Sequence, residues 1–490
     1  MKFRMILKIA LFGLVIGLTG CNKDKKGEEP TSQLVRFLWT EKADVAAAQI
    51  KVINQYGEAV VGAQVLIGDA QGSPFRGNFI LTDKSGAAVV PTLWEAPASV
   101  TVDAKGYIRQ TLLNVKPGNI TLKLNSAYLA ERAELRGQVT GLPVVNGDKL
   151  IDFALVMPAV SKSDLLNFDI GQVISPYSDK LSAAGQENDI PSNISIPKQK
   201  ESYFISVTLD KPVYRLKVPT LGPKRFVTAR GRFVFKDVVK ELRDGKPFHE
   251  LINYFTIHGG SMREATLVDA VTNLDIPGTD LEFKNTIAVN SANAQADEVL
   301  LVLATSELSG TMIPTDVKRA VNGKPTALQS LVGSPAFVIS VIKKQAEFMA
   351  NTPGADRMSA SLVPFVAGAT QKLLPLMANP SITTTVNYVI NLAAVQSVEG
   401  INAIATSAVI SDLVETQDGD KKIITTNRKW DIIGLGWNQQ INLPKWPLDN
   451  ATGRKRVEVN FIGSTTSKST NLDDSLIQNA THVTHASTDF

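Results

Sequence analysis

Residues 48–67 read AQIKVINQYGEAVVGAQVLI and contain two apolar runs separated by a turn-forming segment. Apolar and polar residues alternate over Ala48–Ile53, which is the period of a half-buried strand. Asn54–Glu58 supplies the asparagine and glycine typical of a turn. Val60–Ile67 is again rich in β-branched residues. We therefore expect two short strands joined by a turn.

The same succession of predicted short strands and turns continues to about residue 124. Short apolar runs alternate with turn signals, as in Phe79–Thr82, Asp83–Gly86, Ala87–Val90, Val100–Val102 and Ile120–Leu124. Short strands at near-regular spacing are typical of a β-sandwich, here of about 90 residues.

Three of these pieces carry a family resemblance. Tyr56–Val65, Thr82–Gly86 and Ala104–Tyr107 together resemble the carboxypeptidase-regulatory-like, transthyretin-like module of bacterial surface proteins. The resemblance implies an Ig-like β-sandwich over residues 34–130 that acts as a spacer or binding module, without catalysis. We expect Gly62 to be small because strands cross closely there, and Gly86 to take a positive φ in its turn.

The N-terminal residues have the pattern of a secretory signal. Lys2, Arg4 and Lys8 precede the apolar run Ile9–Leu18, which is too short for a span that needs roughly 20 apolar residues. The run ends at Cys21, the one cysteine in the 490 residues. An uncleaved membrane anchor and an ordinary signal peptide are the alternatives, and neither explains where this cysteine lies.

Leu18-Thr19-Gly20-Cys21 resembles the lipobox of bacterial lipoproteins. The resemblance implies a signal peptide at 1–20, cleavage after Gly20 and lipidation of Cys21, with palmitate among the acyl chains. Asn22 in place of Asp implies sorting to the outer membrane. The charged and small residues of 21–33 cannot bury enough surface to fold, so we expect a flexible tether.

The residues after 130 resemble no family, but they also contain short apolar runs that are typical of strands. We expect short helices at Val238–Leu242 and Phe248–Phe255, where apolar residues have helical spacing. A hairpin is expected from Ser202–Leu209 and Val213–Val218, and Met358–Met377 is a candidate helix interrupted by prolines. The expected fold class is mainly β, with an Ig-like sandwich followed by β-rich domains at 131–295 and 296–490.

Composition excludes several classes of protein. Hydrophobic residues make up 44% and charged residues 20%, which is typical of a globular chain. A single cysteine excludes a disulfide framework. The formal net charge of +4 includes three positive charges of the expected signal peptide, so the mature chain is near neutral and no nucleic-acid partner is expected.

The sequence contains few of the motifs and residues that are typical of an active site. No H-E-x-x-H, Walker, G-x-S-x-G or G-x-G-x-x-G motif occurs, so we expect no catalytic residue, metal or cofactor. His482 and His485 are spaced as metal ligands on a helix, but a strand would place them on opposite faces, and we expect an exposed tail. His249 and His258 are expected at the surface.

Two tryptophans are the candidates for ligand binding. Trp430 and Trp437 flank one short run and either form an exposed platform for sugar or peptide or fill a sandwich core.

The favoured function is that of a non-enzymatic, lipid-anchored envelope protein that acts as a binding, adhesion or structural module, with an envelope protein or a polysaccharide as its partner. The alternative is a hydrolase of cell-wall or surface polymer, with carboxylates after residue 131 that the sequence does not reveal.

Overall fold

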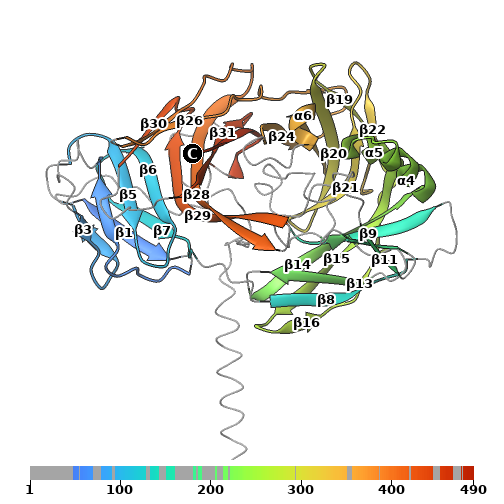
Figure 1. Cartoon of the computed structure of the whole chain (residues 1–490), viewed down its shortest axis with the longest axis horizontal. Coiled ribbons are helices and arrows are strands. Elements are labelled where there is room, and N and C mark those ends of the chain that lie inside the picture. Colours follow the sequence, from blue (N-terminus) through green and yellow to red (C-terminus); the bar gives the residue numbers. More distant parts are fainter. Residues whose placement is uncertain are drawn as a thin grey trace, which may run out of the picture. The chain divides into compact units, whose positions relative to one another are not determined.

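The chain divides into Met1–Thr31 and Ser32–Phe490. All residues that the computed structural model describes belong to the second part; they are 48–54, 56–69, 79–90, 94–127, 133–142, 150–159, 180–183, 186–189, 205–206, 213–218, 221–292, 294–349, 356–385, 387–418, 421–444, 453–466, 476 and 478–490. Strands predominate and helices are few and short, which confirms the expected mainly-β fold class (Figure 1). The expected signal peptide, the tether and Cys21 lie outside the described residues.

The first strands form two sheets that share a core. One sheet has the order β4-β1-β7, and the edge of a larger sheet has the order β6-β5-β2-β3. Burial alternates along β1, as the sequence predicts, and its Ile50 and Val52 are fully buried. Val65, Val102 and Leu112 from the other sheet belong to the same core cluster. The bounds are β1 (Gln49–Asn54), β2 (Gln64–Ile67), β3 (Ile80–Leu81), β4 (Ala87–Val89), β5 (Ala98–Asp103), β6 (Arg109–Val115) and β7 (Ile120–Leu124).

The predicted turn at Asp83–Gly86 forms around the Asp83 carboxylate. Its Oδ1 accepts hydrogen bonds from the backbone N–H groups of Ser85 (2.8 Å) and Ala87 (3.0 Å). Gly86 has the predicted positive φ, of 77°. Gly62 also has a positive φ, of 72°, but no atom lies within 4 Å of where its Cβ would be. The expectation of closely crossing strands at Gly62 is therefore wrong, because the turn geometry is what requires glycine.

Residues 133–282 form further sheets, with the orders β12-β9-β14-β15-β18 and β13-β8-β16 and with β17 beside β8. The predicted helices are confirmed as α4 (Phe235–Arg243) and as α5 (Phe248–Leu251) followed by the 3₁₀ turn η1 (Ile252–Tyr254). The strands are β8 (Ala133–Thr140), β9 (Ile151–Pro158), β10 (Lys180–Ala183), β11 (Gln186–Asp189), β12 (Ile205–Ser206), β13 (Val213–Val218), β14 (Gly222–Phe233), β15 (Phe255–Leu267), β16 (Val271–Asn273), β17 (Ile276–Pro277) and β18 (Leu281–Glu282).

One predicted hairpin is wrong. Strand β12 pairs with β9, whereas β13 pairs with β8 in another sheet. Local alternation predicts that two strands exist, but it does not determine which partners they take.

The largest sheet has twelve strands in the order β21-β20-β23-β24-β32-β31-β28-β29-β6-β5-β2-β3. Two three-stranded sheets, β22-β19-β25 and β26-β27-β30, accompany it. The remaining elements are β19 (Asn285–Ser291), β20 (Glu298–Leu308), β21 (Thr311–Arg319), β22 (Thr326–Ser330), β23 (Ala336–Lys344), α6 (Gln345–Met349), β24 (Met358–Pro364), β25 (Thr370–Gln371), β26 (Ser381–Thr383), β27 (Tyr388–Asn391), β28 (Asn402–Asp418), β29 (Lys421–Leu435), β30 (Gln440–Leu443), β31 (Lys455–Ser464) and β32 (His482–Asp489).

The candidate helix at Met358–Met377 is wrong. Its first part is strand β24, whose residues Met358–Leu362 are all buried between β23 and β32. A strand with both faces covered carries a continuous apolar and small-residue run, which the periodicity of a short segment does not distinguish from a helix.

The twelve-stranded sheet combines strands from the first expected domain, 34–130, with strands from the third, 296–490. Strand β29 pairs in parallel with β6, with Trp430 opposite Arg109. One core cluster contains Ile50 from the first expected domain, Leu251 from the second and Val341 from the third. Whether the three ranges fold as separate domains stays a prediction, but side chains from all three share one core.

Candidate functional site

Trp430 is not an exposed platform. It is 2% exposed, its Nε1–H donates to Thr111 Oγ1 (2.8 Å), and the Arg109 guanidinium lies 4.7 Å from its ring centroid. The core interpretation is therefore correct for this residue, and the binding interpretation is wrong.

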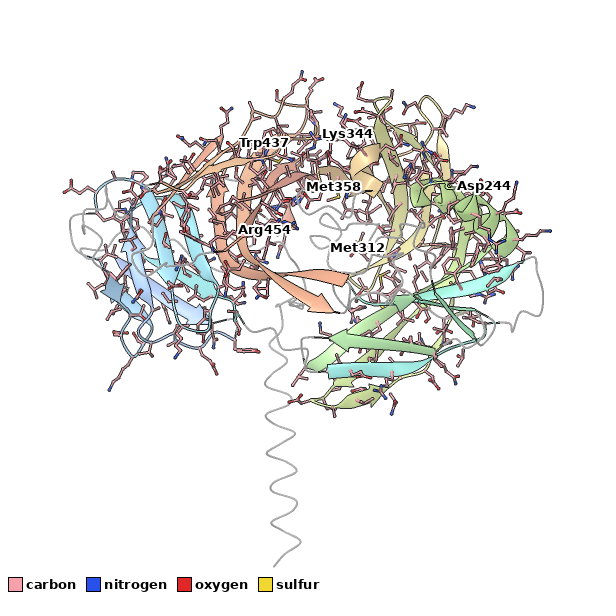
Figure 2. All side chains as sticks on the ribbon, viewed as in Figure 1. Asp244, Met312, Lys344, Met358, Trp437 and Arg454 are labelled. Carbon is pink, nitrogen blue, oxygen red and sulfur yellow. The ribbon has the colours of Figure 1, made fainter. Side chains whose placement is uncertain are left out.

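Trp437 is half-buried at the end of the same run (Figure 2). Its ring stacks on Phe461 with the centroids 5.7 Å apart, and its Nε1–H donates to the carbonyl of Ile462 (2.9 Å). One ring face and the N–H group are thereby occupied within the chain.

The expected exposed tail around His482 and His485 is wrong, because both residues lie in β32 between β24 and β31. His482 is 2% exposed and contacts Thr481 Oγ1 and the Lys372 carbonyl. Burial lowers the pKa of His482 to about 4. His485 lies on the other face of the strand, as residues three apart must.

The two remaining histidines differ from each other. His249 is fully buried, contrary to expectation, and burial lowers its pKa to about 4. His258 is half-buried, and its pKa is lowered by burial and by the nearby Arg230 and Arg232.

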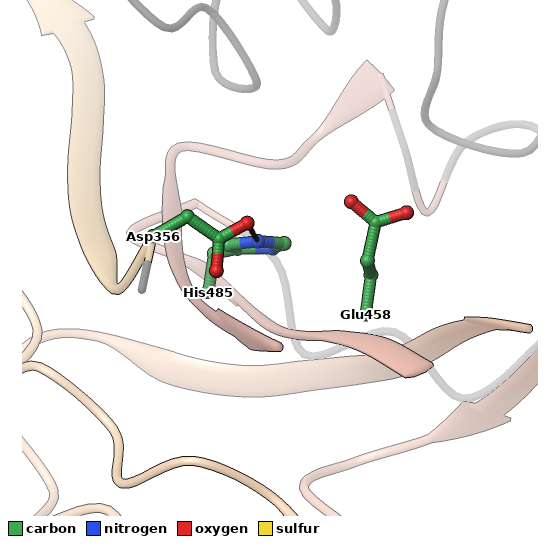
Figure 3. Close-up of side chains that lie close together, drawn as sticks. All are labelled: Asp356, Glu458 and His485. Atoms are coloured by element: carbon green, nitrogen blue, oxygen red, sulfur yellow. Dashed lines mark hydrogen bonds and ion pairs between the residues drawn. The ribbon is translucent and has the colours of Figure 1, made fainter. Parts of the chain in front are cut away.

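One group of side chains brings together a histidine and two carboxylates. Asp356, Glu458 and His485 each offer a ligand atom, and these atoms all lie within 4.8 Å of one another (Figure 3). All three side chains are half-buried. No other such group occurs among the residues that the structure describes.

Strand pairing explains why these residues meet. His485 pairs with Asn460 and Ser487 pairs with Glu458 across β31 and β32, so the four residues form one block on one face. On the other side His485 pairs with Met358 of β24. Asp356 lies two residues before β24 begins, and its hydrogen bond with Ser487 holds it next to this block.

Hydrogen bonds fix the orientation of two of the three side chains. Asn460 Nδ2 donates to Ser407 Oγ (3.2 Å), which turns Asn460 Oδ1 toward His485 Nδ1 at 2.9 Å. Ser487 Oγ donates to Asp356 Oδ1 (2.5 Å), which leaves Asp356 Oδ2 facing His485 Nε2 at 3.3 Å. The Glu458 side chain makes no hydrogen bond with any residue that the structure describes, and it is half-buried.

The charge of the group depends on the protonation of His485. Burial lowers the pKa of His485, but the Asp356 carboxylate and then Glu458 outweigh this, and the resulting pKa lies above the ordinary value. Arg456 bonds Asp489 at 2.7 Å and 3.3 Å, so its charge is neutralised by that carboxylate. The group therefore has an excess of negative charge whenever His485 is neutral.

The sequence indicates one member of this group, His485, and not the other two. Its spacing from His482 is that of a ligand pair on a helix, but in β32 His482 faces away. Asp356 and Glu458 carry no motif, and only the pairing of β24, β32 and β31 brings them to His485. The alternation Glu458-x-Asn460 and His485-x-Ser487 was the available signal, since it places polar pairs on one face of each strand.

Comparisons with known proteins identify no relative. No protein family and no curated protein matches this chain. The weakly similar solved structures include the major pilin subunit BcpA of Bacillus cereus (10% identity, 66% of this chain, 97% of the pilin, TM-score 0.12), a point variant of that pilin (10%, 61%, 87%, 0.12) and a mutant of Salmonella alpha-2-macroglobulin (10%, 94%, 40%, 0.13). In the described part of the chain, no helix has the length and apolarity needed to span a membrane.

Proposed function

We propose that this protein is a lipid-anchored component of the bacterial cell envelope whose β-sheet body acts as a binding or structural module. The observation that carries the proposal is the tetrapeptide Leu18-Thr19-Gly20-Cys21, which ends an apolar run at the one cysteine of the chain. Two or three acyl chains hold a folded domain on a membrane durably, because each buried methylene contributes about 0.8 kcal/mol.

The mainly-β body supports the second half of the proposal. Sheets expose loops and edge strands that recognise partners by shape and by added strands. The partner is then an envelope protein or a polysaccharide, and the expected location is the outer membrane.

Cell fractionation tests the anchoring. Wild-type protein should sediment with membranes, and Cys21→Ser should either appear in the soluble fraction or accumulate as the uncut precursor. A Cys21→Ser protein that stays on membranes at the mature size would refute the proposal.

Binding and turnover distinguish the two functional classes. The proposal predicts saturable binding of envelope polysaccharide or envelope protein without turnover, weakened by Trp437→Ala. The hydrolase alternative is favoured by one observation, the proximity of the Asp356 and Glu458 carboxylates. It predicts turnover of peptidoglycan, glycan or peptide that is lost in Glu458→Gln.

A further inference from the structure

We infer that Asp356, Glu458 and His485 form a binding site for one divalent transition-metal cation of the zinc class. This inference goes beyond the proposed envelope role and does not depend on it. It rests on the types of ligand, on their spacing and on the hydrogen bonds that hold them.

The three ligand atoms, one nitrogen and two oxygens, suit a cation of borderline softness. A neutral imidazole and carboxylate oxygens are ordinary ligands of Zn²⁺, which accepts nitrogen and oxygen together. Ca²⁺ and Mg²⁺ prefer oxygen alone, so the imidazole disfavours them. Three protein ligands also leave one position of a tetrahedral site open.

The separation of Asp356 Oδ2 from His485 Nε2 fits ligands of one ion. At 3.3 Å it is longer than a strong charge-assisted hydrogen bond, which is usually below about 3.0 Å. Two ligands at about 2.0–2.1 Å from a tetrahedral Zn²⁺ lie about 3.3–3.5 Å apart. The third donor, on Glu458, lies within 4.8 Å of both, so rotation of this one side chain closes the site.

The tautomer of His485 is set for coordination. Asn460 Oδ1 is an acceptor, because its amide nitrogen already donates to Ser407, so His485 Nδ1 must carry a hydrogen. The neutral ring then presents the lone pair of Nε2 toward the two carboxylates. Three acceptors facing one another repel unless a proton or a metal ion lies between them.

Partners behind the ligands are typical of metal sites. Asn460 orients the imidazole and Ser487 orients the Asp356 carboxylate, in the way that outer-shell groups fix metal ligands. Two described cations act on this group: Lys343, which is buried, and Arg456, which Asp489 neutralises.

Calorimetric titration of the full chain with zinc chloride, after removal of bound metal by a chelator, tests the inference. We expect saturable binding of one Zn²⁺ per chain that excess MgCl₂ or CaCl₂ does not displace. Glu458→Gln keeps the shape of the side chain and should weaken binding at least tenfold, and Asn460→Ala should weaken it about 10–100-fold. Glu307→Gln, the same change at an exposed position of β20, should bind like wild type.

Cobalt(II) gives an independent readout. A four-coordinate Co²⁺ bound to wild type should show visible d–d absorption that Glu458→Gln lacks. The inference is wrong if the folded chain binds no Zn²⁺, or if Glu458→Gln binds it as tightly as wild type. Circular dichroism of each variant establishes that it is folded.

Discussion

The indole of Trp430 joins two strands that are distant in sequence. Its N–H group bonds Thr111 of β6, and Arg109 covers its ring, so one side chain fixes how β29 and β6 pair. Trp430→Phe should lower the free energy of unfolding by about 1–2 kcal/mol, because it removes the buried hydrogen bond from the indole N–H to Thr111. Urea denaturation measures this, with Trp437→Phe as the control; that half-buried site should lose less. An equal loss of stability in both variants would show that the hydrogen bond of Trp430 makes no special contribution.

Buried histidine makes the fold sensitive to acid. The pKa of His482 is lowered from 6.5 to about 4 by burial, so the unfolded chain takes up a proton that the folded chain refuses. Above pH 6.5, His482 is neutral in both states and does not lower the free energy of unfolding. As the pH falls below 6.5 the free energy of unfolding decreases, by about 3 kcal/mol at pH 4. Unfolding of wild type and His482→Gln should therefore depend on pH differently between pH 7 and pH 4. Parallel pH profiles would show that His482 does not contribute.

At the residue scale the sequence predicts faces but not burial. The three-residue spacing of His482 and His485 indicates opposite faces of a strand, and their partners lie on opposite faces. The same segment is rich in Thr, Ser and His, which suggested an exposed tail. It is buried because β24 and β31 pair with it, and these partners are distant in sequence.

At the scale of one element, the turn before β4 depends on Gly86. A Cβ there would lie 2.5 Å from the Val52 carbonyl oxygen, and φ is +77°. Gly86→Ala should cost at least about 2 kcal/mol, whereas Gly57→Ala, with positive φ but open space, should cost about 1 kcal/mol. Thermal melts of both variants measure the difference. A Gly86→Ala protein as stable as Gly57→Ala would contradict the close approach to Val52.

Elements with one exposed face were predictable, and elements with two covered faces were not. Alternation over Ala48–Ile53 predicts β1, and helical spacing from Phe248 predicts α5 with η1. Met358–Leu362 shows no such alternation because both faces of the strand are buried. Its pattern therefore does not distinguish a strand from a helix. Strand pairing over long separations, as between β12 and β9, depends on tertiary packing that local pattern does not contain.

At the scale of the whole molecule, the first module encloses one part of the shared core and has an incomplete edge. Its two sheets enclose Ile50, Val65 and Leu112, so residues 34–128 should fold alone as a β-sandwich. Without β29, strand β6 keeps β5 as a partner but becomes an unpaired edge on its other side, so the melting temperature should be lower than in the full chain. Circular dichroism with a thermal melt measures both. A disordered spectrum without a cooperative transition would contradict independent folding.

Mass spectrometry of the mature protein's N-terminal peptide measures whether Cys21 is lipidated and begins the mature chain. The protein extracted from membranes should begin at Cys21 and carry the added mass of two or three acyl chains. An N-terminus that retains residues 1–20, or an unmodified Cys21 thiol in the membrane-bound protein, would contradict lipid anchoring through Cys21.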